Sequence, residues 1–141
     1  MGYPQYEENF EDLDSNSVEG LIRLSRWIDN WPANRARDRE AALWGRVAKV
    51  GEEGGEVIEA MIAATGQNPR KSVPDGDGLE FVQKELLDVA VTALGAIVHL
   101  REEQGVFGAD PITMLHEHIA KVVTRAQEKD PNFPAPLVVQ T

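Results

Sequence analysis

Four glutamates stand close together in one stretch of the chain, Glu52, Glu53, Glu56 and Glu59. On a helix, their spacing places Glu52, Glu56 and Glu59 along one stripe, with Glu53 beside it. Like charges at such spacings destabilise a helix by roughly a few tenths of a kcal/mol per pair, and a bound cation is the simplest relief. A solvated helix face explains the same cluster when it is considered alone.

A second acidic pair, Glu85 and Asp88, lies in an otherwise apolar stretch. Asp88 stands between Leu87 and Val89, so we expect its side chain to be buried. An isolated buried carboxylate costs several kcal/mol or takes up a proton, unless it is paired or binds a metal. Asp88 therefore indicates either a metal site or a buried structural network with arginine or lysine.

The chemistry of these carboxylates depends on how their helices pack. If the two helices are antiparallel, Glu53 and Glu56 can face Glu85 and Asp88. Such a site offers only oxygen ligands, which hard cations prefer. The sequence therefore predicts a Mg²⁺ site, with Mn²⁺ as the alternative ion.

Helical periodicity and capping residues predict four helices that position these side chains. Their approximate ranges are 18–30, 34–64, 79–104 and 110–128. Ser15, Asn16 and Ser17 offer N-caps to the first helix, and Asp110-Pro111 begins the last one. No stretch favours a strand, so the expected fold is all-α and similar to a four-helix bundle.

We expect residues 1–141 to form a single domain. Residues 1–14 are the expected N-terminal extension, 15–128 the helical core, and 129–141 an extended tail that contains prolines. A polar loop at 65–78 joins the two acidic helices. Gly54 and Gly55 interrupt the second helix, and close helix packing or the close approach of a ligand is the expected compensation.

The composition excludes several classes of function. Lys and Arg number 14 against 24 Asp and Glu, and the resulting net charge of -10 argues against duplex nucleic acid as a partner. The absence of cysteine excludes thiolate nucleophiles and cysteine-ligated metals. The longest apolar run, 86–100, is too short to span a membrane, and residues 1–14 lack a signal-peptide core. We expect a soluble, cytoplasmic protein that has no membrane partner.

Histidine and tryptophan are weaker candidates for chemistry. The histidines form no His-x-x-x-His or Glu-x-x-His pair, so we expect structural or surface positions and no di-iron site. Tryptophan can stack on a nucleobase, but in a small bundle it is more often a core residue, and we expect core positions. The residues concerned are His99, His116, His118, Trp27, Trp31 and Trp44.

The two acidic motifs resemble the signature of the MazG-like, all-α NTP pyrophosphohydrolases, which is Glu-Glu-x-x-Glu on one helix and Glu-x-x-Asp on the next. Here they read Glu52-Glu53-Gly54-Gly55-Glu56 and Glu85-Leu86-Leu87-Asp88. The similarity extends over about residues 18–128, and the first glycine departs from the family pattern without removing a ligand. The resemblance implies a MazG-type fold that homodimer or homotetramer formation completes.

By this resemblance, the chain hydrolyses a ribo- or deoxyribonucleoside triphosphate to the monophosphate and pyrophosphate with Mg²⁺. The implied Mg²⁺ ligands are Glu53, Glu56, Glu85 and Asp88. Glu52 would bind a further ion or orient the attacking water. Basic residues on the last helix look similar to the family's phosphate-binding positions, and polar loop residues could also reach a triphosphate; these are Lys121, Arg125, Asn68, Arg70 and Lys71.

Two other functions stay open on the sequence alone. Phosphoribosyl-ATP pyrophosphatase of histidine biosynthesis shares the acidic helical motif but acts on a different nucleotide, and product analysis separates the two. A non-catalytic helical dimer that binds nucleotides or a protein partner would use the carboxylates only for Mg²⁺-dependent stability. Mg²⁺ binding without turnover would favour that reading.

Overall fold

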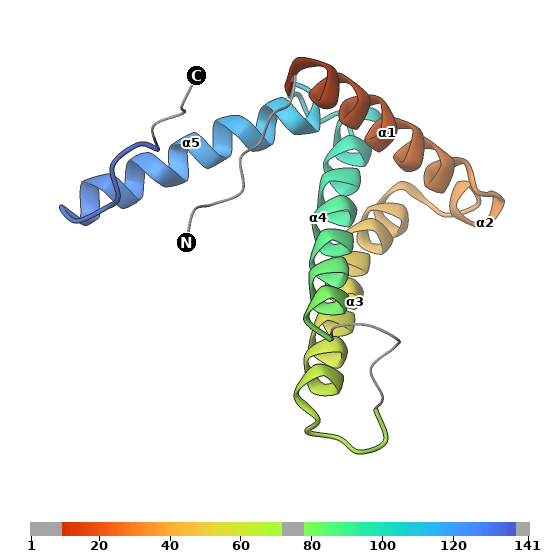
Figure 1. Ribbon diagram of the computed structural model, residues 1–141. Helices are drawn as coiled ribbons and strands as arrows, with labels where there is room; N and C mark the ends of the chain where they lie inside the picture. The colour runs from red at the N-terminus through yellow and green to blue at the C-terminus, as the bar shows by residue number, and fades with distance from the viewer. Residues whose placement is uncertain (1–9, 72–77, 138–141) are drawn as a thin grey trace.

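The computed structural model describes residues 10–71 and 78–137, and every regular element within these ranges is a helix (Figure 1). In chain order the helices are α1 (Phe10–Asn30), α2 (Pro32–Arg35), α3 (Arg39–Thr65), α4 (Gly78–Glu103) and α5 (Pro111–Lys129). The predicted all-α class is confirmed for the described residues. Parts of the expected extension, loop and tail, at 1–9, 72–77 and 138–141, lie outside them.

Helix α1 begins at Phe10, earlier than the expected start near residue 18. Ser15, Asn16 and Ser17, which we expected as N-caps, lie inside the helix with exposed side chains. Exposed serine and asparagine bond to water, and their low helix propensity costs only roughly 0.5 kcal/mol each. The prediction of these caps is therefore wrong, and part of the expected extension is helical.

The second predicted helix is divided in two. Pro32 occupies the first position of the short α2, and α3 starts only at Arg39. Asp38 caps α3, because its carboxylate accepts a hydrogen bond of 2.8 Å from a backbone N–H in the first turn. The predicted helix over 34–64 is thus wrong at its beginning. Its end is confirmed, since α3 stops at Thr65 before Gly66, whose φ is 68°.

Helices α4 and α5 agree with the sequence-based ranges. The carboxylate of Asp110 caps α5 by accepting hydrogen bonds of 3.0 Å from the backbone N–H groups of Ile112 and Thr113. The Thr113 hydroxyl also donates to it, at 2.7 Å. These bonds, the hydroxyl first, lower the pKa of the Asp110 carboxyl. Pro111 follows the cap at the first helical position, as predicted.

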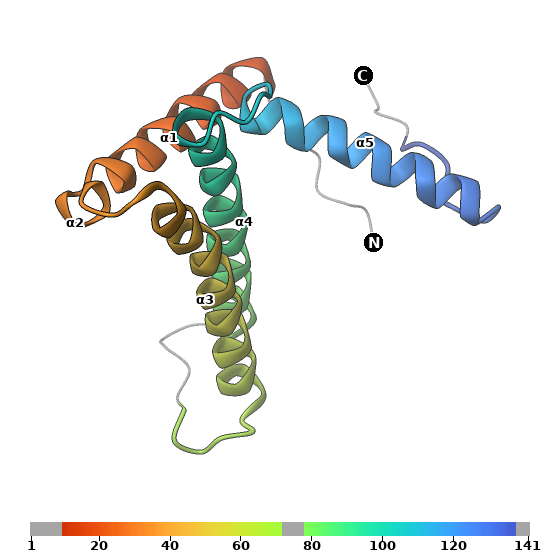
Figure 2. The same ribbon diagram turned by 180° about the vertical axis from the view of Figure 1, so that it is seen from behind.

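Helices α3 and α4 form a long antiparallel hairpin (Figures 1 and 2). Helix α1 crosses one end of this hairpin and packs against the C-terminal half of α4, with α2 beside it. Helix α5 starts at the same end and points away from the hairpin in both views. Over the described residues, one copy of the chain therefore does not close into a four-helix bundle.

The core of this open arrangement is small. The buried apolar side chains of the described residues are Leu21, Ala60, Val82, Ala96 and Val98. Large apolar side chains stay exposed, including Leu86 and Leu87 of α4. Monomeric soluble proteins rarely expose apolar surface on this scale. None of the described helices is long and apolar enough to cross a membrane.

Candidate metal centre and the adjoining pocket

Three carboxylates of the hairpin come together. Glu53 and Glu56 lie one turn apart on α3, and Glu85 lies on α4. Each offers one oxygen, and the three oxygens all lie within 4.8 Å of one another. The antiparallel packing expected from the sequence thus gathers three of the four predicted metal ligands.

Glu85 is the buried carboxylate of this group, with 4% of its surface exposed. Its Oε1 accepts a hydrogen bond of 3.2 Å from Lys84 Nζ. Its Oε2 is buried and has no hydrogen-bond partner among the described residues. A buried acceptor without a partner costs about 1–3 kcal/mol, and more when the group is charged. Glu85 Oε2 is therefore a buried acceptor that a bound cation or a hydrogen-bond donor would stabilise.

The expectation that Asp88 is the buried carboxylate is wrong. Its side chain is 45% exposed and forms an ion pair of 2.9 Å with Lys84, one turn earlier on α4. The neighbouring Leu87 is also exposed, because no described helix covers that face of α4. Asp88 lies outside the group of three carboxylates that the structure brings together.

Lys49 links the two adjacent glutamates of the first motif. Its Nζ lies 3.0 Å from Glu52 Oε1 and 3.1 Å from Glu53 Oε1, and these pairs raise the pKa of Lys49, with Glu52 first. The side chain of Glu53 is 12% exposed, whereas that of Glu52 is 62% exposed. Glu52 thus stands at the solvent edge of the cluster, where its carboxylate can reach water.

Mutual repulsion makes the cluster receptive to a cation. The pKa of Glu56 is raised, chiefly by the negative charge of Glu53, then by desolvation and by the charge of Glu85. The ammonium of Lys49 offsets only part of this effect. Neighbouring negative charges therefore weaken the ionised form of Glu56, and a bound cation would relieve that repulsion.

Gly54 and Gly55 lie on α3 between these ligands. A Cβ placed on either glycine would meet no atom within 4 Å. Close helix packing therefore does not explain them in one copy of the chain. The surface beside both glycines is open to an approaching ligand.

The loop residues predicted to reach a triphosphate lie at the C-terminal end of α3. Asn68 Oδ1 accepts a hydrogen bond of 3.0 Å from the backbone N–H of Arg70. Lys71 Nζ forms an ion pair of 3.2 Å with Glu59. Lys71 is thus held beside the acidic stripe of α3, outside the group of three carboxylates.

Lys121 and Arg125 form no ion pair with a carboxylate among the residues that the structure describes. Both lie on the exposed part of α5, the helix that points away from the hairpin (Figures 1 and 2). They line a hollow formed by α5 side chains together with His118. The predicted surface position of His116 and His118 is confirmed.

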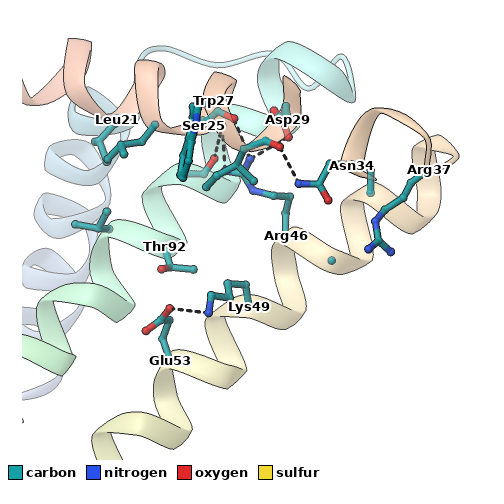
Figure 3. Close-up of a pocket in the computed structure, with 16 residues that line it drawn as sticks. Leu21, Ser25, Trp27, Asp29, Asn34, Arg37, Arg46, Lys49, Glu53 and Thr92 are labelled. Atoms are coloured by element: carbon teal, nitrogen blue, oxygen red, sulfur yellow. Dashed lines mark hydrogen bonds and ion pairs between the residues drawn. The ribbon is translucent and has the colours of Figure 1, made fainter. Parts of the chain in front are cut away.

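A pocket of about 570 Å³ opens beside Glu53, between α1, α3 and α4 (Figure 3). Much of its wall is apolar, with Leu21, Leu24, Ile28 and Val91. Its charged groups are Arg37, Arg46 and Lys49 together with the acids Asp29 and Glu53. A mainly apolar pocket of this size with a few polar groups is typical of a small-molecule site.

The inner wall of the pocket is a polar network that the sequence analysis missed. Asp29 Oδ1 accepts hydrogen bonds from Arg46 Nη1 at 2.9 Å and from His99 Nδ1 at 2.8 Å. Arg46 Nη2 donates to the Ser25 hydroxyl at 3.0 Å, and that hydroxyl donates to the Gly95 carbonyl at 3.2 Å (Figure 3). All of these side chains are buried or nearly so.

The network fixes the role of His99, which is 2% exposed. Its Nε2 lies 3.1 Å from the amide nitrogen of Gln104, which can only donate, so the proton is assigned to Nδ1, facing Asp29. The predicted structural role of His99 is confirmed. The available sequence signal was Ser25 and Asp29, two polar residues four apart on the apolar face of the first helix.

The tryptophans are exposed, contrary to the core positions expected from the sequence. Trp27, Trp31 and Trp44 have 63%, 55% and 66% of their surface exposed. The reason is the open arrangement, in which α1 crosses only one end of the hairpin. Trp27 packs edge to face on Trp31 with ring centroids 6.0 Å apart, and it also lines the pocket.

No protein-family model, curated protein or solved structure matches this chain. The candidate site therefore consists of three converging carboxylates, one of which has a buried oxygen without a partner among the described residues, beside a pocket lined by both cationic and acidic side chains.

Proposed function

We propose that this protein is a Mg²⁺-dependent pyrophosphohydrolase that cleaves nucleoside triphosphates to nucleoside monophosphates and pyrophosphate. One observation carries the proposal. Glu85 Oε2 is buried without a partner among the described residues, and Glu53 and Glu56 each place a carboxylate oxygen within 4.8 Å of a carboxylate oxygen of Glu85. A purely structural ion-pair network would satisfy that oxygen. The reaction class comes from the resemblance of the two acidic motifs.

The donor set fits Mg²⁺. Octahedral Mg²⁺ holds oxygens at about 2.1 Å, which places neighbouring ligand oxygens roughly 3–4 Å apart. The three carboxylate oxygens, within 4.8 Å of one another, need only a small inward movement to meet this requirement. No histidine belongs to the group, and the chain has no cysteine. Mg²⁺ usually keeps several waters, so three protein ligands suffice.

In the proposed reaction, three glutamates bind Mg²⁺ and a fourth accepts a proton. When bound, Mg²⁺ supplies positive charge that neutralises phosphate oxygens and lowers the pKa of water at the site. Glu53, Glu56 and Glu85 hold that charge in place. Glu52, at the solvent edge, is the carboxylate positioned to accept a proton from the attacking water. No side chain needs to form a covalent intermediate.

The pocket beside Glu53 is the proposed nucleoside site. Its apolar walls exclude water, and Trp27 offers an aromatic face at which base stacking contributes ~1–3 kcal/mol. Arg37 and Lys49 line the same pocket and complement the negative charge of phosphates. A nucleotide whose nucleoside occupies the pocket therefore extends past Glu53 toward the acidic cluster.

The test is product analysis over a panel of nucleotides. Purified protein is incubated with ribo- and deoxyribonucleoside triphosphates and with phosphoribosyl-ATP, each with Mg²⁺ or Mn²⁺, and the products are separated by chromatography. The Glu85→Gln variant removes the charge of the buried ligand. Glu80→Gln is the matched control, because Glu80 is an exposed glutamate in the first turn of the same helix.

We expect monophosphate and pyrophosphate from wild type and from Glu80→Gln, and turnover lower by about 10²–10³-fold in a folded Glu85→Gln variant. Preferred cleavage of phosphoribosyl-ATP would move the assignment to the phosphoribosyl-ATP pyrophosphatases. Mg²⁺ binding without turnover of any nucleotide would contradict the enzymatic proposal and favour a binding module.

A further inference from the structure

Lys84 is a cation at the acidic cluster that the proposed reaction does not use. Its Nζ lies 3.2 Å from Oε1 of Glu85, the buried member of the three converging carboxylates. It also lies 2.9 Å from Oδ2 of Asp88, which stands outside them. The ring of Phe81 is 5.9 Å away, within the range of a cation–π contact. Lys84 therefore bridges one carboxylate of the cluster and one carboxylate beside it.

A second lysine at the cluster makes the same kind of bridge but has a different surrounding. Lys49 on α3 pairs with Glu53 of the cluster and with Glu52 outside it. Lys49 also lines the pocket of about 570 Å³, where the proposed function gives it a phosphate to bind. Lys84 does not line that pocket. Its contacts are thus with the carboxylates and with Phe81, and its role must be sought there.

The contacts of Lys84 are easily exchanged. Its side chain is 63% exposed, whereas that of Glu85 is buried. Exposed ion pairs are weak because water and salt screen them, and because a long side chain loses freedom in forming them. Hydrogen bonds to Asp88 first, and then to Glu85, raise the pKa of Lys84, so the side chain is charged at neutral pH. The ammonium can leave for solvent while the buried carboxylate keeps its place.

A divalent cation would compete with Lys84 for the same carboxylate. Lys84 Nζ donates hydrogen bonds to Glu85 Oε1 and to Asp88 Oδ2, two groups that the acidic motifs predict as metal ligands. Since Nζ is 3.2 Å from Glu85 Oε1, a cation that Glu85 binds at about 2.1 Å would lie roughly 5–7 Å from the ammonium. In a water-like dielectric, the repulsion of a divalent and a monovalent cation at that separation lowers affinity by about tenfold.

We propose that Lys84 is the counter-ion of the acidic cluster in the metal-free protein and that it lowers the affinity of the cluster for divalent metal. Without metal, its charge offsets part of the repulsion among the carboxylates. When a divalent cation binds, the ammonium leaves Glu85 and Asp88 for solvent. Lys84 is thus a residue that tunes the metal ligands and touches no substrate. This role rests on the proposed metal centre, and it is independent of nucleotide turnover.

Metal titration tests this role without any assay of activity. Electron paramagnetic resonance follows the binding of Mn²⁺ to metal-free protein, and Mg²⁺ is measured by its displacement of Mn²⁺. Lys84→Met removes the charge and keeps an unbranched side chain, whereas Lys84→Arg keeps the charge. Lys71→Met is the matched control. It removes the same charge from an exposed lysine whose partner, Glu59, lies outside the three carboxylates.

We expect Lys84→Met to lower the Kd for both metals by about tenfold relative to wild type. Lys84→Arg and Lys71→Met should stay within about twofold of wild type, because the first retains the charge and the second loses a charge that solvent screens. The difference between wild type and Lys84→Met should narrow as NaCl rises from about 0.02 M to about 0.5 M. Circular dichroism verifies each fold, and Lys84→Gln repeats the test with a polar side chain.

Three results would overturn the proposal. The first is an equal Kd in Lys84→Met and Lys71→Met, since the effect would then follow net charge alone. The second is tighter binding in Lys84→Arg as well, because the change would not follow the charge at this position. The third is the absence of metal binding in wild type and in every variant.

The titration also separates this proposal from the enzymatic one. If the metals bind with the expected order of affinities but no nucleotide is cleaved, the proposed function fails and the role of Lys84 stands. If nucleotides are cleaved but the affinities of wild type and Lys84→Met are equal, the proposed function stands and the role of Lys84 fails.

Discussion

Two groups of charged side chains lie along the hairpin of α3 and α4, one of them centred on Asp29 of α1 and the other on Glu85 of α4, and they differ in how fully their charges are paired. Around Asp29, the guanidinium of Arg46 and the imidazole of His99 satisfy a buried carboxylate. Around Glu85, two further carboxylates converge and one buried oxygen has no partner within the described residues. We call the paired residues Asp29, Arg46 and His99 the closed group, and Glu53, Glu56 and Glu85 the open group. The closed group stabilises the fold. The open group can bind a ligand, but its unpaired charges lower the stability of the fold.

The largest expected effect comes from breaking the closed group. Asp29→Ala leaves the nearly buried Arg46 without its counter-ion, and we expect it to lower the free energy of unfolding by about 3–5 kcal/mol. Glu102→Ala is the control, because it breaks the exposed pair with Arg26 and should cost at most about 1 kcal/mol. Urea unfolding measures both. Equal losses would show that the network does not stabilise the fold.

The open group should respond in the opposite way. Glu85→Gln removes a negative charge that has no buried partner, so the free energy of unfolding should change by less than about 1 kcal/mol. Turnover should fall by about 10²–10³-fold, because charge held at the reaction centre is lost. Both quantities are measured on one preparation. Full activity together with a large loss of stability would reverse the roles assigned to the two groups.

Mg²⁺ should stabilise the protein through the open group alone. At a concentration one hundred times Kd, binding to the folded state adds about 2.7 kcal/mol to the free energy of unfolding. Thermal unfolding with and without Mg²⁺ measures the gain. Asp29→Ala should retain it and Glu85→Gln should lose it. An equal gain in both variants would place the cation elsewhere.

The N-cap of α5, Asp110, gives a smaller effect on stability with which the effects at the two charged groups can be compared. Asp110→Ala should destabilise α5 by about 1 kcal/mol at neutral pH. Because the pKa of Asp110 is lowered from its ordinary 3.8, the stabilisation by its carboxylate is complete above that value and is lost as pH falls through the lowered pKa.

Circular dichroism between neutral and acidic pH follows this effect. The difference between wild type and Asp110→Ala should narrow in acid, whereas Asp110→Asn, which caps without titrating, should differ from Asp110→Ala by the same amount throughout. A constant difference between wild type and Asp110→Ala would contradict the assigned capping role.

Local sequence signals were sufficient to predict most of the helices and the proximity of the acidic side chains of α3 and α4. The Asp110-Pro111 cap fixed the start of α5, and the apolar periodicity fixed the range of α4. Glu53, Glu56 and Glu85 could be brought together because a short polar loop joins two long helices, which leaves antiparallel packing as the simple arrangement.

The errors concern which face of a helix another helix covers. Asp88 is not buried, since its burial depended on a neighbour against that face of α4. The exposure of Trp27 and the contact of Asp29 with His99 depend on where α1 crosses α4, a contact between residues 70 positions apart. Local periodicity carries no information about such a crossing.

Phosphorus NMR with and without metal tests the central claim most directly. Wild-type protein is mixed with the preferred nucleoside triphosphate from the panel, first with excess EDTA and then with excess Mg²⁺, and the spectrum is followed over time. Signals of the monophosphate and pyrophosphate should appear only after Mg²⁺ is added. Turnover in EDTA, or the appearance of nucleoside diphosphate and orthophosphate instead, would contradict a Mg²⁺-dependent pyrophosphohydrolase centre at Glu53, Glu56 and Glu85.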